Sequence, residues 1–353
     1  MTIADALHSV KTVVVHANCS DGLASAILIH DVLPKAEVQF IQYNTEPHKA
    51  LTPQPGFLFC DFSPFAETEE IEGENGVAKR ALTESGKSQI QAWVEAGALV
   101  LDHHATVKDL GLIQPFLDAG QGAFGDEKAD PGVCGAVLAF RHVWLPLKTL
   151  KAKKGLGLEE DLKACALQAE NFATLAGIRD TWQKDSVRWR EACTQGEMLR
   201  FYPPENWLSC VEPFHYRNRG WWDERMALGK LLIEKHEKTV TRVIEKAYRF
   251  TTPKGTRVAV FSGAHLSSDA SEALGQEADL VIGFAYEVEN GTPKLICSNR
   301  SRGTYPVRVF AESLGGGGHK NAAGFSCTLG GIELNPYAHI KQLVEAFETP
   351  KTT

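Results

Sequence analysis

The stretch ALVLDHHAT, Ala98 to Thr106, decides how the first half of this sequence is interpreted. Four mostly apolar residues with strand-like character lead directly into Asp102, His103 and His104. A carboxylate and two imidazoles at the end of a buried element are costly unless they are paired or bound to a metal. The stretch therefore indicates a chemical site, and the alternative is a helix-capping Asp followed by two surface histidines.

Strand-like and helix-like segments alternate through the first hundred residues, which predicts an α/β domain with a parallel sheet and helices on both faces. In such sheets, ligands bind beyond the carboxyl ends of the strands. Two segments lack a clear period: we expect a mobile loop or short excursion over Glu67 to Lys87 and a long loop over Gly111 to Gly132. The expected strands are Thr12–Val15, Val38–Tyr43, Phe57–Cys60 and Ala98–Leu101.

The pattern changes after a long amphipathic segment, Asp223 to Tyr248, whose apolar residues recur every three to four positions. Beyond it, three strand-like runs and a helix-like run, Val307 to Leu314, predict a smaller α/β domain. An earlier helix, Leu162 to Ala176, is expected to stop at GIRDTW, Gly177 to Trp182. The predicted organisation is a catalytic domain over 1–221, a connecting helix over 222–248 and a substrate-binding domain over 249–353.

The composition limits the classes of function. A formal net charge of -7 argues against a broad surface for long duplex nucleic acid, because such binding neutralises many phosphates. The 8 cysteines are scattered singly, which suits a reducing cytoplasm. No window approaches a membrane-spanning length of apolar residues, and the N-terminus lacks a signal-peptide pattern. We therefore expect a cytoplasmic protein without membrane insertion.

Oxygen and nitrogen donors follow the expected strand ends and loops. Carboxylates and imidazoles without paired thiolates favour Mn²⁺, Mg²⁺ or a similar divalent cation. Five such ligands are too many for one ion with an open position, whereas two ions that share a carboxylate can activate a water and hold a phosphoryl oxygen. The five donors are His16, Asp21, Asp61, His103 and Asp180.

A second cluster is GGGGHKNAAGF, Gly315 to Phe325. Consecutive glycines at a helix end let backbone amides approach a ligand, and such amides bind phosphate or carboxylate oxygens. His319 and Lys320 follow directly, and Arg300 precedes the run. This concentration of donors favours an anion site over a flexible linker.

These pieces together resemble the DHH phosphoesterase superfamily, in the branch with a DHH-associated C-terminal domain. That branch includes RecJ-like exonucleases, nanoRNase and pAp-phosphatase proteins and cyclic-dinucleotide phosphodiesterases. The matching motifs occur in family order over nearly the whole chain. They are HANCSDGLAS (His16–Ser25), CDFS (Cys60–Ser63), LDHHAT (Leu101–Thr106), IRDTW (Ile178–Trp182), SNRS (Ser298–Ser301) and GGGGHKNAAGF.

The resemblance implies a role for each metal-site residue. Asp61 would bridge two Mn²⁺ ions, with Asp21, His103 and Asp180 on one ion and His16 on the other. His104 would face the scissile phosphate, and Asp102 would orient a neighbouring imidazole. In the second domain, the resemblance implies that the non-reacting part of the substrate is held by Arg300, Gly316, Gly317, Gly318 and His319.

One position departs from the family pattern. Many relatives have two aspartates separated by one residue in the first motif, and here the earlier position is Cys19. Cys19 is expected to be a soft ligand that alters the choice of metal; the other interpretation is a spectator that leaves the His16 ion weakly held. Asn18 is a further candidate ligand.

The leading prediction is an Mn²⁺-dependent phosphoesterase, with Mg²⁺ as the alternative ion. It would use a metal-activated water in an interdomain cleft to hydrolyse short single-stranded oligonucleotides, nucleotides or other small phosphate esters. Two alternatives stay open: a pyrophosphatase or exopolyphosphatase, and a non-catalytic nucleotide-binding or nucleic-acid-binding module. A homodimer stays open as well.

Overall fold

The chain forms two compact units, which are an N-terminal unit, Met1–Ile233, and a C-terminal unit, Glu234–Thr353. The division falls inside the long helix α12 (Arg219–Glu245), so the predicted domain limits at 221 and 248 stay a prediction. The computed structural model describes residues 3–17, 19–72, 78–153, 159–208, 219–289, 292–303, 305–328 and 335–349.

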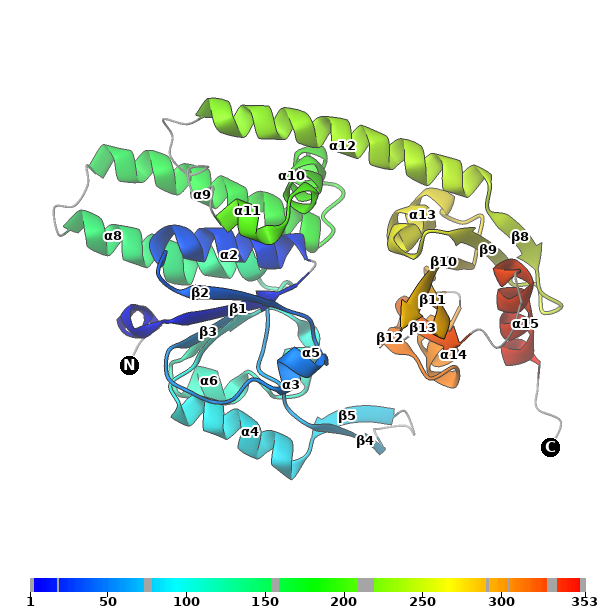
Figure 1. Ribbon diagram of the computed structural model, residues 1–353, viewed down its shortest axis with the longest axis horizontal. Coiled ribbons are helices and arrows are strands. Elements are labelled where there is room, and N and C mark those ends of the chain that lie inside the picture. Colours follow the sequence, from blue (N-terminus) through cyan, green and yellow to red (C-terminus); the bar gives the residue numbers. More distant parts are fainter. Residues whose placement is uncertain are drawn as a thin grey trace. The chain divides into compact units, whose positions relative to one another are not determined.

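The N-terminal unit is built on a 5-stranded sheet with strand order β2-β1-β3-β6-β7. Figure 1 labels β1, β2 and β3 of this sheet. Every neighbouring pair is parallel, which confirms the predicted α/β class. Cys60 pairs with both Val15 and Leu101, so three central strands end at about the same level. The strands are β1 (Thr12–His16), β2 (Glu37–Ile41), β3 (Phe57–Cys60), β6 (Leu99–Asp102) and β7 (Gly122–Phe124).

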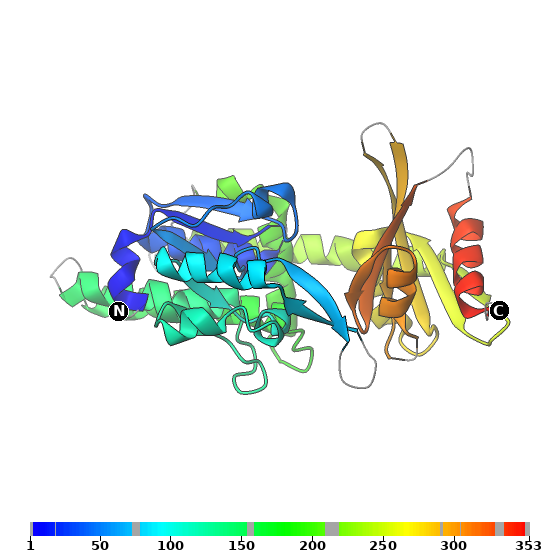
Figure 2. The ribbon, with the colours of Figure 1, turned by 90° about the horizontal axis from the view of Figure 1, so that it is seen from below.

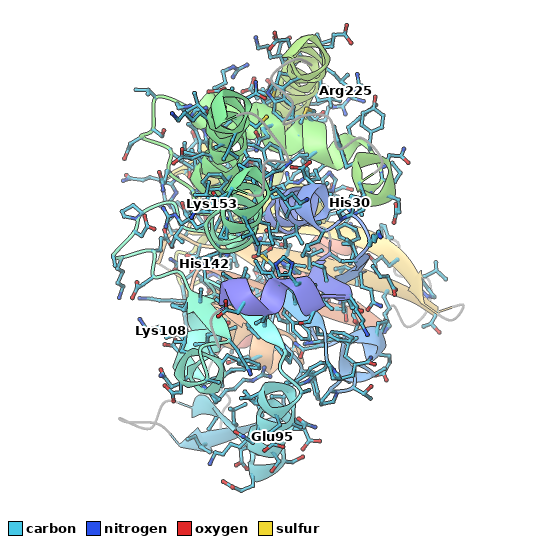
Figure 3. The ribbon with its side chains drawn as sticks, turned by 90° about the vertical axis from the view of Figure 1, so that its left-hand side faces the viewer. His30, Glu95, Lys108, His142, Lys153 and Arg225 are labelled. Atoms are coloured by element: carbon cyan, nitrogen blue, oxygen red, sulfur yellow. The ribbon has the colours of Figure 1, made fainter. Side chains whose placement is uncertain are left out.

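Helices cover both faces of this sheet, because successive side chains of a strand point to opposite sides. Val13 and Val15 pack with helices α2 (Ser20–Val32), α7 (Gly135–Ala139) and α9 (Glu159–Asp180). Val14 packs on the other face with α4 (Glu84–Glu95) and α6 (Gln114–Asp118). In Figure 3, the labelled Glu95 of α4 and Lys153 of α8 lie on these two sides. The remaining described helices of this unit are α1 (Ile3–Ala6), α3 (Glu46–Lys49), α5 (Ala105–Asp109), α8 (Leu145–Lys153), α10 (Trp189–Phe201) and α11 (Pro204–Leu208), with a 3-10 turn at Leu7–Ser9 and a π-helical turn at Phe140–Trp144.

Both expected irregular segments contain regular structure; Glu67 to Lys87 is a short excursion and not a loop, and the predicted long loop over Gly111 to Gly132 was wrong. The segment after Asp61 includes a hairpin of β4 (Thr68–Glu72) and β5 (Ala78–Leu82), followed by α4. This hairpin forms a 2-stranded sheet of its own, so it lacks the apolar alternation of a strand in a core sheet. The glycine-rich segment contains α6 and β7. Glycine at position 122 allows these two elements to pack closely, since a Cβ there would lie only 3.0 Å from the Phe116 Cβ.

Helix α9 also continues past the point where the sequence predicts its end. It spans Glu159–Asp180, so Asp180 is its last residue. Gly177 does not break the helix; it allows close packing, since a Cβ there would lie 2.0 Å from the Gly132 carbonyl oxygen. The reach of α9 matters because it carries Asp180 to the carboxyl edge of the sheet.

The C-terminal unit contains a 6-stranded mixed sheet with order β12-β13-β11-β10-β9-β8. Only β9 and β10 pair in parallel among these described strands, and the other neighbours are antiparallel. Helices α14 (Val307–Ser313) and α15 (Pro336–Glu348) pack on one face, and α13 (Ser267–Leu274) and the end of α12 pack on the other (Figure 2). The strands are β8 (Tyr248–Thr251), β9 (Arg257–Ser262), β10 (Leu280–Glu289), β11 (Thr292–Arg300), β12 (Gly317–His319) and β13 (Ala322–Thr328), and a 3-10 turn covers Ala264–Leu266.

Among the described residues, no helix is both long enough and apolar enough to cross a lipid bilayer.

Candidate metal centre

The carboxyl ends of β1, β3 and β6 place the acidic and imidazole side chains together. His16 ends β1, Asp61 follows β3, and Asp102 ends β6 and is followed by His103 and His104. Helix α2 adds Asp21 from its first turn, and α9 adds Asp180 from its last. The donor atoms form three groups within which all atoms lie within 4.8 Å of one another: His16, Cys19 and Asp61; Asp61, His103 and His104; and Asp21, His103 and Asp180.

Asp61 lies at the centre of these groups. Its side chain is 1% exposed, and its backbone adopts the left-handed region with φ 55°, which is uncommon outside glycine. The turn is held because the Asp61 amide donates to the Leu101 carbonyl at 3.0 Å. Oδ1 of Asp61 lies 3.1 Å from Nε2 of His103, and Oδ2 lies 3.9 Å from Nδ1 of His16. One carboxylate therefore faces two sets of donors.

Asp21 is anchored by a helix from a distant part of the chain. The amide of Gly135 donates to Asp21 Oδ2 at 2.7 Å, and the amide of Ala136 donates to Oδ1 at 2.8 Å. These amides open α7, where the first N–H groups have no partner within the helix. Gly22 allows α2 to begin close to β1, since a Cβ there would lie 2.3 Å from the His16 carbonyl oxygen. Asp21 is thus fully buried with a fixed orientation.

His103 joins the carboxylates of two helices. Its Nε2 lies 3.6 Å from Asp21 Oδ2 and 3.5 Å from Asp180 Oδ2. The ring is 10% exposed, whereas the Asp180 carboxylate, at 25%, is the more open of the two. These three side chains form a group that opens toward solvent at Asp180.

Asp102 is buried behind the two histidines and contacts both of them. Its Oδ1 accepts hydrogen bonds from the backbone amides of His103 and His104, at 2.7 and 3.0 Å. The same oxygen lies 2.7 Å from Nδ1 of His104, and Ser63 donates its hydroxyl to Oδ2. Although burial raises the pKa of Asp102, these hydrogen bonds and the nearby His104 lower it below its usual value overall. Asp102 therefore fixes the His104 ring with Nε2 directed away from it.

The other carboxylates crowd one another. Burial, with the charges of Asp21 and Asp180, raises the pKa of Asp61 well above its usual range. Burial and Asp21 raise the pKa of Asp180 to about 6. Burial and the same carboxylates also raise the pKa of the Cys19 thiol. Such a cluster is unfavourable by itself and becomes favourable with cations between the carboxylates.

The residues fit divalent cations. Within the described part of the chain, His16 Nδ1 and Asp61 Oδ2 are buried and have no hydrogen-bond partner. Buried polar atoms are nearly always satisfied, so two unpaired polar atoms that face one another, each able to be a metal ligand, indicate an ion as their partner. Imidazole nitrogens and carboxylate oxygens are also the ligands that Mn²⁺ accepts. Cys19 belongs to the His16 group, and Asn18 lies outside the described residues.

The predicted anion residues of the C-terminal unit are described separately. Arg300 ends β11, and its guanidinium donates to Ser268 Oγ at 3.1 Å and to Ser298 Oγ at 3.0 Å. Burial lowers its pKa. Gly317, Gly318 and His319 form β12 at the edge of the sheet, although the His319 side chain lies outside the described residues. Gly316 differs from the expectation, since its amide already donates to the Ala311 carbonyl at 2.8 Å and is not available to an anion.

Sequence reasoning missed several residues of the site. Ser63 lies in the CDFS motif but has no role assigned from the sequence, and nothing in the sequence around Gly135 indicates a role at the site. Tyr43 was also missed; its ring contacts His16 edge to face, with centroids 5.2 Å apart, and His104 at 6.0 Å. The aromatic residue shortly after an edge strand was the available signal, because residues after parallel strands gather at one edge.

Comparisons with known proteins agree with this architecture. Residues 256–349 match the family model of the DHHA1 domain. The DHH domain of a protein that belongs to a family of ribosomal proteins has a TM-score of 0.51 at 13% identity, over 98% of this chain and 87% of that one. This likeness shows a shared fold. Together, the DHHA1 match and the shared fold confirm the predicted resemblance to DHH proteins with a DHHA1 domain.

Two further solved structures are similar at a lower level. The pGpG-specific phosphodiesterase PggH from Vibrio cholerae has a TM-score of 0.48 at 11% identity, over 96% of this chain and 98% of that one. RecJ from Thermus thermophilus, in complex with Mn²⁺, has a TM-score of 0.41 at 18% identity, over 99% of this chain and 54% of that one. No curated protein matches the sequence.

Proposed function

We propose that this chain, which has the fold of a DHH-domain protein and carries a DHHA1 domain, is a divalent-metal-dependent phosphoesterase. The observation that carries the proposal is Asp61, a buried carboxylate whose two oxygens face different donor groups. A carboxylate shared by two ions is the arrangement expected of a two-metal phosphoesterase. The substrate class we propose is short oligonucleotides or small nucleotides, and the proposed ion is Mn²⁺, with Mg²⁺ as the alternative.

Two of the three donor groups would each hold one ion. Asp61 would be the shared ligand, with His16 and Cys19 on one side and the Asp21, His103 and Asp180 group on the other. When bound, the ions supply a hydroxide nucleophile at neutral pH and neutralise charge that develops on phosphorus. The protein keeps the ligands in place, because Asp21 and Asp61 are held by backbone hydrogen bonds.

His104 would contact the scissile phosphate. Since Asp102 accepts from Nδ1 of His104, Nε2 is the ring nitrogen left to contact a phosphate oxygen. The buried Asp102 carboxylate fixes the orientation of the ring, and Ser63 satisfies the second oxygen of Asp102. The 32% exposed His104 ring can be reached by a substrate from solvent.

The C-terminal unit would hold the non-reacting part of the nucleotide. Arg300 supplies a charged fork that suits phosphate oxygens. Gly317 and Gly318 of the edge strand β12 would lie at the substrate, with the backbone N–H that points away from β13 available to it, and His319 would contribute its imidazole. Gly316 would act through close packing against β13 and not through its amide, because a Cβ there would lie 2.1 Å from the Gly324 carbonyl oxygen.

The test is to assay the purified full chain with Mn²⁺ against a short RNA, pAp, a linear dinucleotide and polyphosphate. We expect turnover of at least one nucleotide substrate, its loss with a chelator, and its loss in Asp61→Asn. The matched control is Asp126→Asn, an exposed aspartate paired with Lys108 at 2.7 Å, which should keep full activity. Turnover of polyphosphate alone would overturn the substrate class, and no turnover of any substrate would overturn the enzyme proposal.

A further inference from the structure

Arg179 stands next to the metal centre but is not one of its ligands. It precedes Asp180 in the last turn of α9. Its guanidinium carbon lies 4.4 Å from the ring centroid of Trp182 and 5.3 Å from that of Trp189. The two indoles meet edge to face, with centroids 5.4 Å apart. Cation-aromatic contacts of this kind hold an arginine side chain in one place while its N–H groups stay open.

The hydrogen-bond donors of Arg179 are not used by the protein. Among the residues that the structure describes, its guanidinium forms no hydrogen bond and no ion pair. Arg188, in the same segment, behaves differently, because its Nε donates to Glu191 Oε2 at 2.9 Å. A guanidinium offers five donors in a planar fork that matches a phosphate group. An arginine that is fixed by stacking yet has open donors is therefore prepared for an anion.

The position of Arg179 relates it to the first turn of α2. A Cβ placed on Gly196 of α10 would lie 3.6 Å from Arg179 Cγ and 3.9 Å from Ser20 Oγ. Arg179 and Ser20 thus flank the same point, one residue away from Asp180 and from Asp21 respectively. The Asp180 carboxylate approaches His103, whereas the Arg179 guanidinium lies against the indoles. Arg179 is therefore beside the donor groups and not among them.

Trp182 adds a second unusual feature at this place. Its backbone has φ 58°, a left-handed conformation that bulky residues rarely adopt. Its side chain is 37% exposed, and Nζ of Lys184 lies 4.6 Å from its ring centroid. The Trp182 backbone is strained, and its indole contacts the positive groups of Arg179 and Lys184. The indole therefore keeps positive charge at the rim of the metal centre.

We propose that Arg179 binds a second phosphate group of the substrate, adjacent to the phosphate that reacts at the metal centre. This inference rests on the proposed phosphoesterase function and narrows its substrate class to molecules with at least two phosphates. The reacting phosphate meets the metal ligands, so the group that reaches Arg179 is its neighbour along the substrate. Trp182 and Trp189 are positioning residues, because they act on the substrate only through the guanidinium.

A different role for Arg179 would be to compensate the charge of Asp180. In that case, replacing Arg179 would weaken metal binding and would affect every substrate equally. Our proposal requires a selective effect, since only a ligand with a second phosphate reaches the guanidinium. Metal affinity and ligand selectivity therefore separate the two roles.

The experiment measures binding without turnover. Isothermal titration of the Mn²⁺-loaded full chain would compare methylenediphosphonate, whose P–C–P link is not hydrolysed, with methylphosphonate. We expect Arg179→Met to weaken the binding of methylenediphosphonate about tenfold or more, as for the loss of a charge-assisted hydrogen bond. The affinities for methylphosphonate and for Mn²⁺ should stay within about twofold of the parent chain. Arg188→Met is the matched control and should change neither ligand.

Other outcomes would overturn the inference. If Arg179→Met weakens the binding of both phosphonates equally, or if a loss of Mn²⁺ affinity explains the weaker phosphonate binding, Arg179 serves to compensate charge. If Arg179→Met does not fold, Arg179→Lys provides the test, because lysine keeps the charge and loses the fork; it should show a smaller but still selective loss. Since phosphonate binding needs no catalysis, a chain that turns over nothing in the phosphoesterase assay still answers this question.

Discussion

The backbone amide of Gly135 donates a hydrogen bond to Asp21 Oδ2 at 2.7 Å, joining residues 114 positions apart in the sequence. The contact needs glycine, because a Cβ on Gly135 would lie 2.4 Å from the Cβ of Asp61 and 2.9 Å from Asp21 Oδ2. The start of α7 is thus pressed against both carboxylates. Packing at Gly135 and the arrangement of the metal ligands are therefore one structural feature.

Gly135→Ala is expected to damage both stability and metal binding. The added methyl must push Asp61 and Asp21 apart, and overpacking of a tight interior costs about 1 to 3 kcal/mol. Urea unfolding should show a loss of that size, and bound Mn²⁺ should fall. Gly220→Ala in α12 is the control, since nothing lies within 4 Å of its Cβ position and alanine favours helix. Normal metal content in Gly135→Ala would contradict the coupling.

Ser63→Ala is expected to reduce turnover while leaving metal content unchanged. Its hydroxyl donates to Asp102 Oδ2, so its loss leaves one oxygen of a buried carboxylate unsatisfied. This loss costs about 1 to 3 kcal/mol and leaves Asp102, the partner of His104, less firmly held. We therefore expect kcat to fall about tenfold. Ser88→Ala, which removes an exposed helical hydroxyl, is the comparison. A large drop in bound Mn²⁺ would instead mean that Ser63 supports the ligands.

The convergence of donors could be predicted from the sequence because it follows from one rule of parallel sheets. His16, Asp61 and Asp102 come directly at or after buried strands, and the strand ends of a parallel sheet share an edge. The hold of α7 on Asp21 could not be predicted, since nothing in GAVLA indicates which carboxylate its amides meet. The continuation of α9 to Asp180 was hidden by Gly177, whose helical position depends on contact with Gly132.

His48 predicts a pH dependence of stability. It is 3% exposed, its Nδ1 accepts from the Asn44 amide at 3.1 Å, and its Nε2 lies 3.0 Å from the Ser63 carbonyl. These partners require the neutral ring, with Nδ1 as acceptor and Nε2 as donor, and burial lowers the pKa of His48 below its usual 6.5. As pH falls below about 6.5, the unfolded chain binds a proton that the folded chain does not, so stability is lost.

The measurement is urea unfolding at pH 7.5 and pH 5.5 for the parent chain and His48→Gln. As the pH falls, the free energy of unfolding of the parent should decrease by up to about 1.4 kcal/mol more per pH unit than that of the variant, because one titrating group differs. His8→Gln, at an exposed position, should keep the parent slope. Identical pH slopes in the parent and His48→Gln would show that His48 is not kept neutral by its buried partners.

Asp61 links metal removal to stability. Without cations, its buried carboxylate stands among Asp21, Asp180 and Asp102, and burial with these charges raises its pKa. The metal-free chain should therefore be less stable than the Mn²⁺-loaded chain, because an ion that binds only the folded state adds to its stability. Asp61→Asn removes one of the crowded charges, so it should stabilise the metal-free chain by about 1 to 3 kcal/mol and abolish the gain with Mn²⁺. Thermal unfolding with and without a chelator measures both effects. A variant that is destabilised without metal yet still gains stability with Mn²⁺ would show that Asp61 holds the fold and is not the shared ligand.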